Sequence, residues 1–547
     1  MERTPSGIIH SLFDPRFGPA DRLVPRWLFL RALGGIYFSA FFALLFQVRG
    51  LIGPEGILPA NQYLALVRRS LPAARLWFAP TLLWFSTSNA MLMAICWVGL
   101  IASVAAFCNL WPRLSFFVCF VCYLSFVAAA SEFANYQSDG MLLEAGFLTL
   151  FFSPRGILPG WGVESPPSRA SLFLLQWEWF RIYFESGIVK LLSGDPEWRH
   201  FTAMDEYYQN GPLPTWIGWY IEHLPHRFHA STVAATLFME IMVVFLLFFG
   251  RRARLICFFV VTPWEIGVIL TANYTFLNYL VLALGFLQLD DRFLRRLVPV
   301  RFRRPAVQAE QAPESSSEAP ISLFGNADAG DDPRVEYRKP SHFAAFGLAL
   351  STVMLTWVAY VTTVELIRMP FPEAPLPTAP VRMLEPFRIA NQYGLFAVMT
   401  RGRYEIEFQG SNDGQTWTAY PFRYKPQPLN EPPRIYAPYQ PRFDWNLWFA
   451  SLGDWQQNPL VVYTEERLLT NSRHVLALFR GNPFVDTPPK MVRAVLWQYW
   501  FTSMQEKRET GNWWRRKLLG LYAPMLSRQP DGKIGVVEWP QELPPHN

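Results

Sequence analysis

The stretch that decides the fold is SLFLLQWEWFRIYFESGIVKLL, residues 171–192. It is long enough to cross a bilayer, which takes roughly 20 largely apolar residues. It nevertheless carries four ionisable side chains, Glu178, Arg181, Glu185 and Lys190. Each charge at the centre of a membrane helix costs about 2.5–3.5 kcal/mol on the insertion scale. We therefore expect this helix to lie inside a bundle, with its charges facing protein or a water-filled cavity.

The spacing of these charges predicts how they are neutralised. Residues three or four apart share one face of a helix, so Arg181 can pair with Glu178 and with Glu185. Lys190 lies about 180° around the helix from Arg181, so it needs another partner or a cavity. Near the end of the span, its side chain could also extend to the membrane surface.

We predict an intramembrane polar cluster, because ionisable residues inside membrane segments indicate a functional site by default. Its members are Asp139, Glu144, Glu178, Arg181, Glu185 and Lys190. Two interpretations fit the pattern. The cluster is either an internal ion network that fixes helix packing or the lining of a substrate or client cavity.

The composition of the 547-residue chain indicates a membrane bundle with a soluble part, since 51% of residues are hydrophobic and 17% are charged. The formal net charge of +6 does not indicate nucleic acid, because the arginines cluster beside apolar runs, where they set orientation and contact headgroups. No cysteine occurs after Cys257, so the C-terminal part cannot form disulfides. The spacing of His223, His226 and His229 is interrupted by Pro225, and we expect no metal site and no cofactor.

Apolar runs predict eight or nine membrane spans. Eight runs are long, at residues 27–48, 89–107, 114–130, 171–192, 231–249, 255–270, 275–289 and 343–366. The ninth, residues 141–152, contains Glu144 and is short enough to be re-entrant. Arginines favour the cytoplasmic ends of spans. The arginine clusters at residues 251–254 and 292–304 lie on the same side of the membrane as the N-terminus only if residues 141–152 cross the membrane. We therefore favour nine spans.

These runs divide the chain into four parts. Residues 1–289 are predicted to form an N-terminal transmembrane bundle, and residues 341–367 form the last transmembrane helix. Residues 290–340 begin basic and continue as AEQAPESSSEAP, a composition typical of a disordered cytoplasmic linker. Residues 368–547 then form a β-rich extracytoplasmic domain. The predicted fold class is an all-α multi-pass transmembrane bundle followed by an α+β domain.

The C-terminal domain is predicted to begin with a hairpin. Residues 403–409 alternate between charged and apolar side chains, the turn residues 410–414 follow, and residues 416–422 supply the second strand. After Pro489, apolar residues recur at helical spacing and predict a short amphipathic helix. They are Val492, Val495, Leu496, Tyr499 and Trp500.

Tryptophans are frequent in this domain, and six are candidates for binding a client, because aromatic side chains are typical anchors of protein interfaces. They are Trp445, Trp448, Trp497, Trp500, Trp513 and Trp514. A buried aromatic turn is the simpler interpretation of Trp445 and Trp448. Trp513 and Trp514 precede three basic residues, which also fits a membrane-surface patch or a contact between domains.

Four strings of residues, spread over most of the chain, resemble the lipase maturation factor family. They are QSDGMLLEAGFL (137–148), WEWFRIYFESGIVKLLSGDPEWR (177–199), APYQPRFDWNLWFASL (437–452) and VRAVLWQYWFTSMQEKRETGNWWRR (492–516). The resemblance implies a multi-pass membrane protein that assists folding or maturation of a secreted client such as a lipase, with its C-terminal region in the secretory lumen. No covalent chemistry and no nucleic acid are implied. The long linker and the cysteine-free C-terminal part favour a bacterial inner membrane with a periplasmic domain, whereas eukaryotic family members lie in the endoplasmic reticulum membrane.

Two other hypotheses come from the membrane part. GPEGILPA (53–60), with Tyr183, Gly187 and Lys190, faintly resembles the vitamin K-dependent gamma-carboxylase superfamily. That resemblance implies an intramembrane enzyme with Lys190 as its base, since a desolvated amine loses its proton more readily. A weaker hypothesis is a transporter with an acidic relay, formed by Asp139, Glu144, Glu240 and Glu265. We see no paired interrupted helices of the kind that transporters show, and we favour a protein that is not an enzyme.

Overall fold

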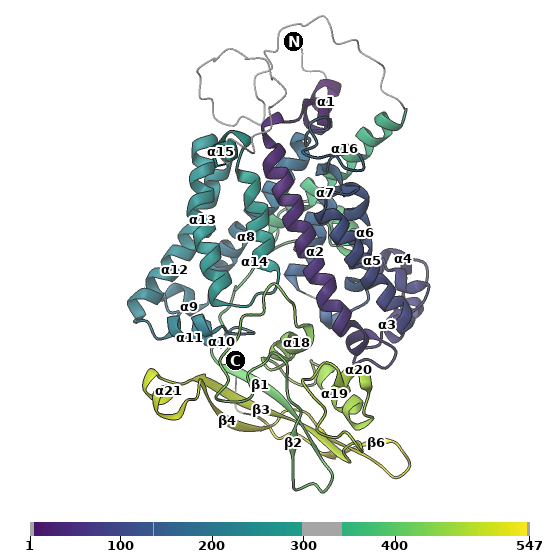
Figure 1. Ribbon diagram of the computed structural model, residues 1–547, viewed down its shortest axis with the longest axis vertical. Helices are drawn as coiled ribbons and strands as arrows, with labels where there is room; N and C mark the ends of the chain where they lie inside the picture. The colour runs from purple at the N-terminus through teal and green to yellow at the C-terminus, as the bar shows by residue number, and fades with distance from the viewer. Residues whose placement is uncertain (1–4, 135, 298–341, 544–547) are drawn as a thin grey trace, which may run out of the picture.

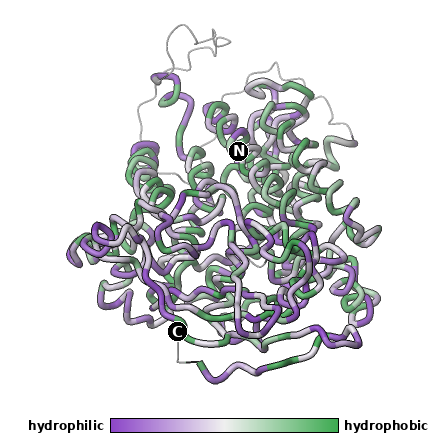
Figure 2. Tube along the Cα trace, turned by 60° about the horizontal axis from the view of Figure 1, so that its bottom comes forward, coloured by the Kyte–Doolittle hydropathy of each residue, from purple (hydrophilic) through white to green (hydrophobic). Residues whose placement is uncertain are grey.

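The computed structural model describes residues 5–134, 136–297 and 342–543, with a helical bundle at one end and a sheet with short helices at the other (Figure 1). The long helices of the bundle are α2 (Leu23–Ile52), α5 (Asn89–Phe107), α6 (Pro112–Val127), α7 (Gln137–Phe152), α8 (Arg169–Leu192), α12 (His226–Ile241), α13 (Arg251–Thr271), α14 (Leu277–Gly285) and α16 (His342–Arg368). Hydrophobic residues gather along these helices (Figure 2).

Five helices in the described ranges are long and apolar enough to cross a membrane, judged by length and composition. They are Ala20–Ile52, Asn89–Phe107, His226–Phe248, Arg251–Thr271 and Ala344–Arg368. Pro112–Val127 and Leu277–Gln288 are apolar but shorter. Helices α7 and α8 carry the predicted intramembrane charges, which lowers their hydropathy. The structure thus supports five candidate spans in the described ranges, and the prediction of eight or nine stays a prediction.

The two ends of the bundle differ in what they contact. At one end, here called the basic end, lie α1 (Pro5–Phe13) and α15 (Asp291–Leu297) (Figure 1). Arg26 Nη1 donates to the Ser165 carbonyl there, at 2.6 Å. At the opposite end the bundle meets the C-terminal domain, where Gln47 Nε2 donates to the Gln440 carbonyl at 2.9 Å. Helix α2 therefore runs the full length of the bundle, from the basic end to the domain.

The predicted cytoplasmic linker begins as ordered structure. Asp291, at the start of α15, accepts a hydrogen bond from the backbone N–H of Val24 at 2.9 Å. This contact ties α15 to α2, so the part of the linker at residues 291–297 belongs to the bundle. The predicted disorder of residues 298–340 lies outside the described residues.

The C-terminal domain is built on an antiparallel sheet, which has six strands in the described part of the chain. They are β1 (Arg403–Ser411), β2 (Thr418–Ala419), β3 (Met491–Phe501), β4 (Trp514–Leu521), β5 (Met525–Arg528) and β6 (Ile534–Glu538). Their order is β2-β1-β3-β5-β6, and β4 also pairs with β3. The predicted hairpin is confirmed, because Gln409 of β1 lies opposite Ala419 of β2.

The helix predicted near residues 492–500 is wrong, because these residues form the central strand β3. Strand β3 pairs with β1 on one side and with β4 and β5 on the other, and both of its faces carry buried residues. A short apolar run that is covered on both faces loses the alternation of a surface strand. Periodicity alone then cannot distinguish it from a helix.

The domain packs on the bundle through a continuous hydrophobic core. That core runs from Leu44 of α2 through Phe443 of α18 (Arg442–Ala450) to Leu496 of β3. Helix α19 (Leu460–Leu469) packs against β3 from the same side, with buried Leu468. Bundle and domain therefore form one folded unit in the described residues.

Candidate functional site

The first polar site joins α7 and α8 to the chain that follows α16. The guanidinium of Arg181 contacts the carboxylate of Glu144 and lies 3.8 Å from that of Glu185. The hydroxyl of Tyr393 donates to Glu144 at 2.8 Å, and its backbone N–H donates to Glu185 at 2.5 Å. The backbone N–H of Asn391 donates to Glu144 at 3.0 Å. One buried guanidinium thus serves two carboxylates, and residues after α16 supply the other hydrogen bonds.

Glu178 lies outside this hydrogen-bond network. Its two carboxyl oxygens are buried and have no hydrogen-bond partner among the described residues. The pair that spacing allowed between Glu178 and Arg181 is absent from the described ion pairs, whereas the pair with Glu185 is present. Arg181 reaches instead to Glu144 on a neighbouring helix.

The second polar site centres on Asp139 and joins α7 to the C-terminal domain. Arg442, the first residue of α18, donates to both carboxylate oxygens of Asp139, at 2.9 and 2.7 Å. It also donates to the hydroxyl of Tyr123 at 2.8 Å. Burial lowers the pKa of Arg442, but the facing Asp139 carboxylate outweighs this effect and raises the pKa above its ordinary value. Arg442 is therefore a buried cation that requires its partner.

The third polar site contains Lys190. Its Nζ donates to both carboxylate oxygens of Glu240 on α12, at 2.9 and 2.8 Å, and to the Ser186 carbonyl at 3.2 Å. The side chain is 2% exposed, so it does not extend to the membrane surface. Five of the six residues predicted as a single polar cluster thus occupy three separate sites, each with its own counter-charge, and Glu178 belongs to none of the described ion pairs.

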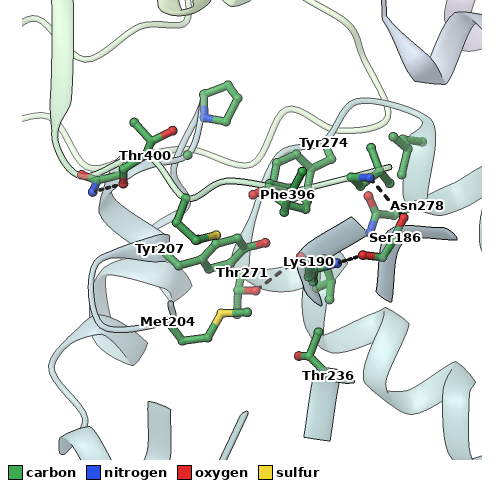
Figure 3. Close-up of a pocket in the computed structure, with 18 of the residues that line it drawn as sticks. Ser186, Lys190, Met204, Tyr207, Thr236, Thr271, Tyr274, Asn278, Phe396 and Thr400 are labelled. Carbon is green, nitrogen blue, oxygen red and sulfur yellow. Dashed lines mark hydrogen bonds between the residues drawn. The ribbon is translucent and has the colours of Figure 1, made fainter. Parts of the chain in front are cut away.

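A cavity of about 750 Å³ lies beside Lys190 and Glu240 (Figure 3). Helices α8, α12, α13 and α14 contribute to its wall, together with residues 394–400 and α18. Most of its lining is apolar or aromatic, as with Tyr207, Tyr274 and Phe396. Its volume lies in the range of small-molecule sites, roughly 300–1,000 Å³.

The six candidate tryptophans do not form one exposed surface. Trp445, Trp448 and Trp514 are buried, and the first two line the cavity. Trp497, Trp500 and Trp513 are half-buried. The segment DWNLWF is not a turn but part of helix α18 (Arg442–Ala450), in which Trp445 and Trp448 are buried and Phe449 is exposed.

Trp497 borders a shallow depression of about 400 Å³ on the sheet, here called the sheet groove. Its lining comprises Glu407, Gln409, Trp417, Ala419, Pro421, Gln427, Pro428, Trp497 and Arg516. The Arg516 guanidinium stacks 4.0 Å from the Trp497 ring and pairs with Glu407 at 3.1 Å. The groove therefore combines indole rings with a fixed guanidinium, a composition enriched at protein-binding hot spots.

The three spaced histidines have separate partners. His226 lies 3.0 Å from Asp205. His223 contacts the backbone carbonyl of Thr502, and His229 contacts that of Leu224. No group of three or more histidine, cysteine or acidic side chains in the described ranges could hold a metal ion.

The fold and its sites define a class of helical membrane protein in which buried ion pairs hold a C-terminal sheet domain on the bundle. Two family models match the chain, the "Lipase maturation factor transmembrane domain" over residues 24–296 and the "Lipase maturation factor C-terminal domain" over residues 389–524. The chain belongs to the lipase maturation factor family and is a membrane protein.

Curated relatives match both parts of the chain. "Lipase maturation factor 2" of Gallus gallus is 31% identical over 587 residues, covering 92% of this chain and 81% of the relative. "Lipase maturation factor 1" of Mus musculus is 30% identical over 556 residues, covering 97% of this chain and 93% of the relative. The Bos taurus "Lipase maturation factor 1" is 29% identical over 539 residues, covering 95% of this chain and 92% of the relative. No solved structure matches the chain.

Proposed function

We propose that this chain is a membrane-anchored factor for the maturation of exported lipases. The observation that carries the proposal is the match over both the membrane part and the C-terminal domain to relatives named lipase maturation factor 1 and 2. The contacts of Lys190 with Glu240 and with the Ser186 carbonyl give this lysine a structural role that joins α8 to α12, which a maturation factor without covalent chemistry requires.

The proposed membrane placement has nine crossings in the described part of the chain. They are α2, α5, α6, α7, α8, α12 with η5 (Val243–Phe248), α13, α14 with η6 (Phe286–Gln288), and α16. The basic end carries Arg251, Arg252 and Arg254 as well as Arg295 and Arg296, which favours the cytoplasm for that end. The sheet domain then lies on the extracytoplasmic side, which is the periplasm if the membrane is a bacterial inner membrane.

Reporter fusions test this placement. Alkaline phosphatase fused after the last residue is expected to be active in a bacterial host, because that enzyme folds only outside the cytoplasm. The same reporter fused after Leu297 is expected to be inactive, and green fluorescent protein at that position is expected to fluoresce. An inactive phosphatase at the C-terminus would contradict the proposed orientation.

We propose that the sheet groove binds the client. Trp497 and Trp417 present indole rings there, and Arg493 stacks 4.0 Å from the Trp417 ring. Aromatic and arginine side chains dominate the binding energy of protein interfaces. The groove lies on the sheet domain rather than in the bundle, so an exported polypeptide can reach it from the proposed extracytoplasmic side.

Trp497→Ala is expected to weaken binding of a client lipase about 30-fold, which corresponds to loss of a hot-spot contact of about 2 kcal/mol. The measurement is a binding titration of the purified full chain with a secreted lipase whose activity depends on co-expression of this chain. Trp500→Ala is the matched control, since Trp500 is also half-buried on β3 but does not line the groove. The control is expected to stay within about threefold of the parent. Equal effects of the two changes would refute the assignment.

A further inference from the structure

We propose that the cavity beside Lys190 and Glu240 binds a neutral single-chain amphiphile with a hydroxyl head group, of the monoacylglycerol type. The head group would donate hydrogen bonds to Glu265 and Asn278, and the chain would extend along the apolar wall. This inference does not depend on the proposed lipase role, because it rests on the cavity and its buried polar groups alone.

The wall of the cavity suits an apolar chain. Met204, Tyr207 and Phe396 line it in Figure 3, and most of the remaining lining is also apolar or aromatic. Three lining residues from different elements are exposed and mark where a ligand can enter. They are Phe228 at 42%, Val398 at 66% and Phe449 at 46%. These exposed side chains belong to both the cavity wall and the protein surface, so the cavity is open to an amphiphile from outside.

Two buried oxygen atoms at the cavity call for a hydrogen-bond donor. Glu265 accepts a hydrogen bond from the Tyr183 hydroxyl at 2.6 Å through Oε2 and interacts with the side chain of Asn278, but its Oε1 makes no hydrogen bond of good geometry with the described residues. The side-chain oxygen of Asn278, Oδ1, is likewise buried without a hydrogen bond in the described part of the chain. An unpaired buried acceptor costs free energy that a suitable donor recovers. Hydroxyl groups supply such donors.

The charges around the cavity disfavour an anionic head group. The ammonium of Lys190 already donates to both oxygens of Glu240, so no free cation lines the described cavity wall. Glu265 adds a further carboxyl group on the same side. A fatty-acid carboxylate or a phosphate would meet carboxylate oxygens without a compensating positive charge, whereas a neutral hydroxyl head meets acceptors that need it.

A photoactivatable monoacylglycerol with a diazirine and an alkyne on its acyl chain tests the site in membranes that contain the full chain. We expect 1-monooleoylglycerol to compete with labelling and expect oleate and methyl oleate to compete at least tenfold more weakly. Equal competition by oleate would overturn the neutral head group. Equal competition by methyl oleate would overturn the role of the hydroxyl groups.

Two glycines give a matched pair of variants. Gly267 lines the cavity, and a Cβ there would meet no atom within 4 Å, so Gly267→Phe fills space without displacing the backbone. Gly347 on α16 is equally open and lies outside the cavity lining. We expect Gly267→Phe to reduce labelling at least fivefold and Gly347→Phe to leave it unchanged. Equal labelling of the two variants would place the probe elsewhere and refute the site.

A second variant keeps the volume of the cavity. Glu265→Gln replaces one acceptor oxygen with an amide donor, and its shape is nearly the same. About tenfold more 1-monooleoylglycerol is expected to be needed for competition in this variant. Competition at the parental concentration would contradict the proposed head-group contact.

Discussion

Arg442→Met is expected to destabilise the folded chain by about 3–5 kcal/mol, because it leaves the buried Asp139 carboxylate without its bidentate partner. The same change is expected to abolish client maturation, since α18 loses its polar attachment to α7. Chemical unfolding of the purified full chain in detergent measures the first effect. Co-expression with a dependent lipase measures the second.

Arg423→Met is the matched control for this prediction. Arg423 is exposed on the same domain, and its replacement is expected to change stability by no more than about 0.5 kcal/mol. The double change Asp139→Leu with Arg442→Met is expected to recover part of the lost stability, because it removes both members of the buried pair. A single Arg442→Met variant as stable as the parent would show that the pair does not hold the domain.

Arg181→Met is expected to cost a similar 3–5 kcal/mol and to release the chain that follows α16. The change leaves Glu144 and Glu185 buried without their shared cation, and the hydrogen bonds from Tyr393 cannot supply charge. Limited proteolysis in membranes measures the release as new cleavage at residues 385–400.

Arg382→Met serves as the control, because Arg382 is exposed on α17 (Ala379–Leu384), close in sequence to the released segment. It is expected to leave the proteolytic pattern unchanged. Adding Glu144→Gln to Arg181→Met is expected to restore part of the protection, since one uncompensated charge is then removed. An unchanged pattern for Arg181→Met would mean that other contacts hold the segment.

The charges of α8 were sufficient to predict that this helix lies inside the bundle, but not which residues neutralise them. Arg181 has the partner that helix spacing allowed at Glu185, and a second at Glu144 that comes from α7. Glu240 and Arg442 come from still more distant elements. Spacing along one helix gives the direction of a side chain and carries no information about which other helix it faces. The partners of these charges could therefore be identified only from the folded structure.

Arg442 had a signal in the sequence that was not used. It lies within APYQPRFDWNLWFASL, a string that carries the family resemblance, close to the candidate residues Trp445 and Trp448. An arginine among large aromatic residues is as informative as a carboxylate in a membrane span, because both need a partner when they are buried. Tyr393 and Asn391 had no such signal, because an uncharged side chain in the loop after α16 does not indicate a buried partner, and part of their role comes from backbone N–H groups that nearly any residue carries.

The C-terminal domain shows where pattern reasoning works and where it fails. Residues 403–409 alternate because one face of β1 packs on the hydrophobic core while the other buries charged residues that pair with one another, as Arg403 does with Glu405, and the hairpin was predicted correctly. Strand β3 is covered on both faces, and its apolar spacing imitated a helix. Tryptophan content alone could not separate buried Trp448 from half-buried Trp497, because composition does not report packing.

The chain after α16 docks on α8 and so holds the sheet domain on the bundle. A Cβ at Gly394 would lie 3.8 Å from the Cβ of Val189, a separation that suits a disulfide. In a chain whose five native cysteines are replaced, Val189→Cys with Gly394→Cys is predicted to form a disulfide on mild oxidation in membranes, measured as loss of maleimide labelling. Leu191→Cys with Gly394→Cys, which places the cysteine on an exposed face of α8, is predicted to remain reduced. Failure of the first pair to oxidise, or equal oxidation of both pairs, would contradict the account.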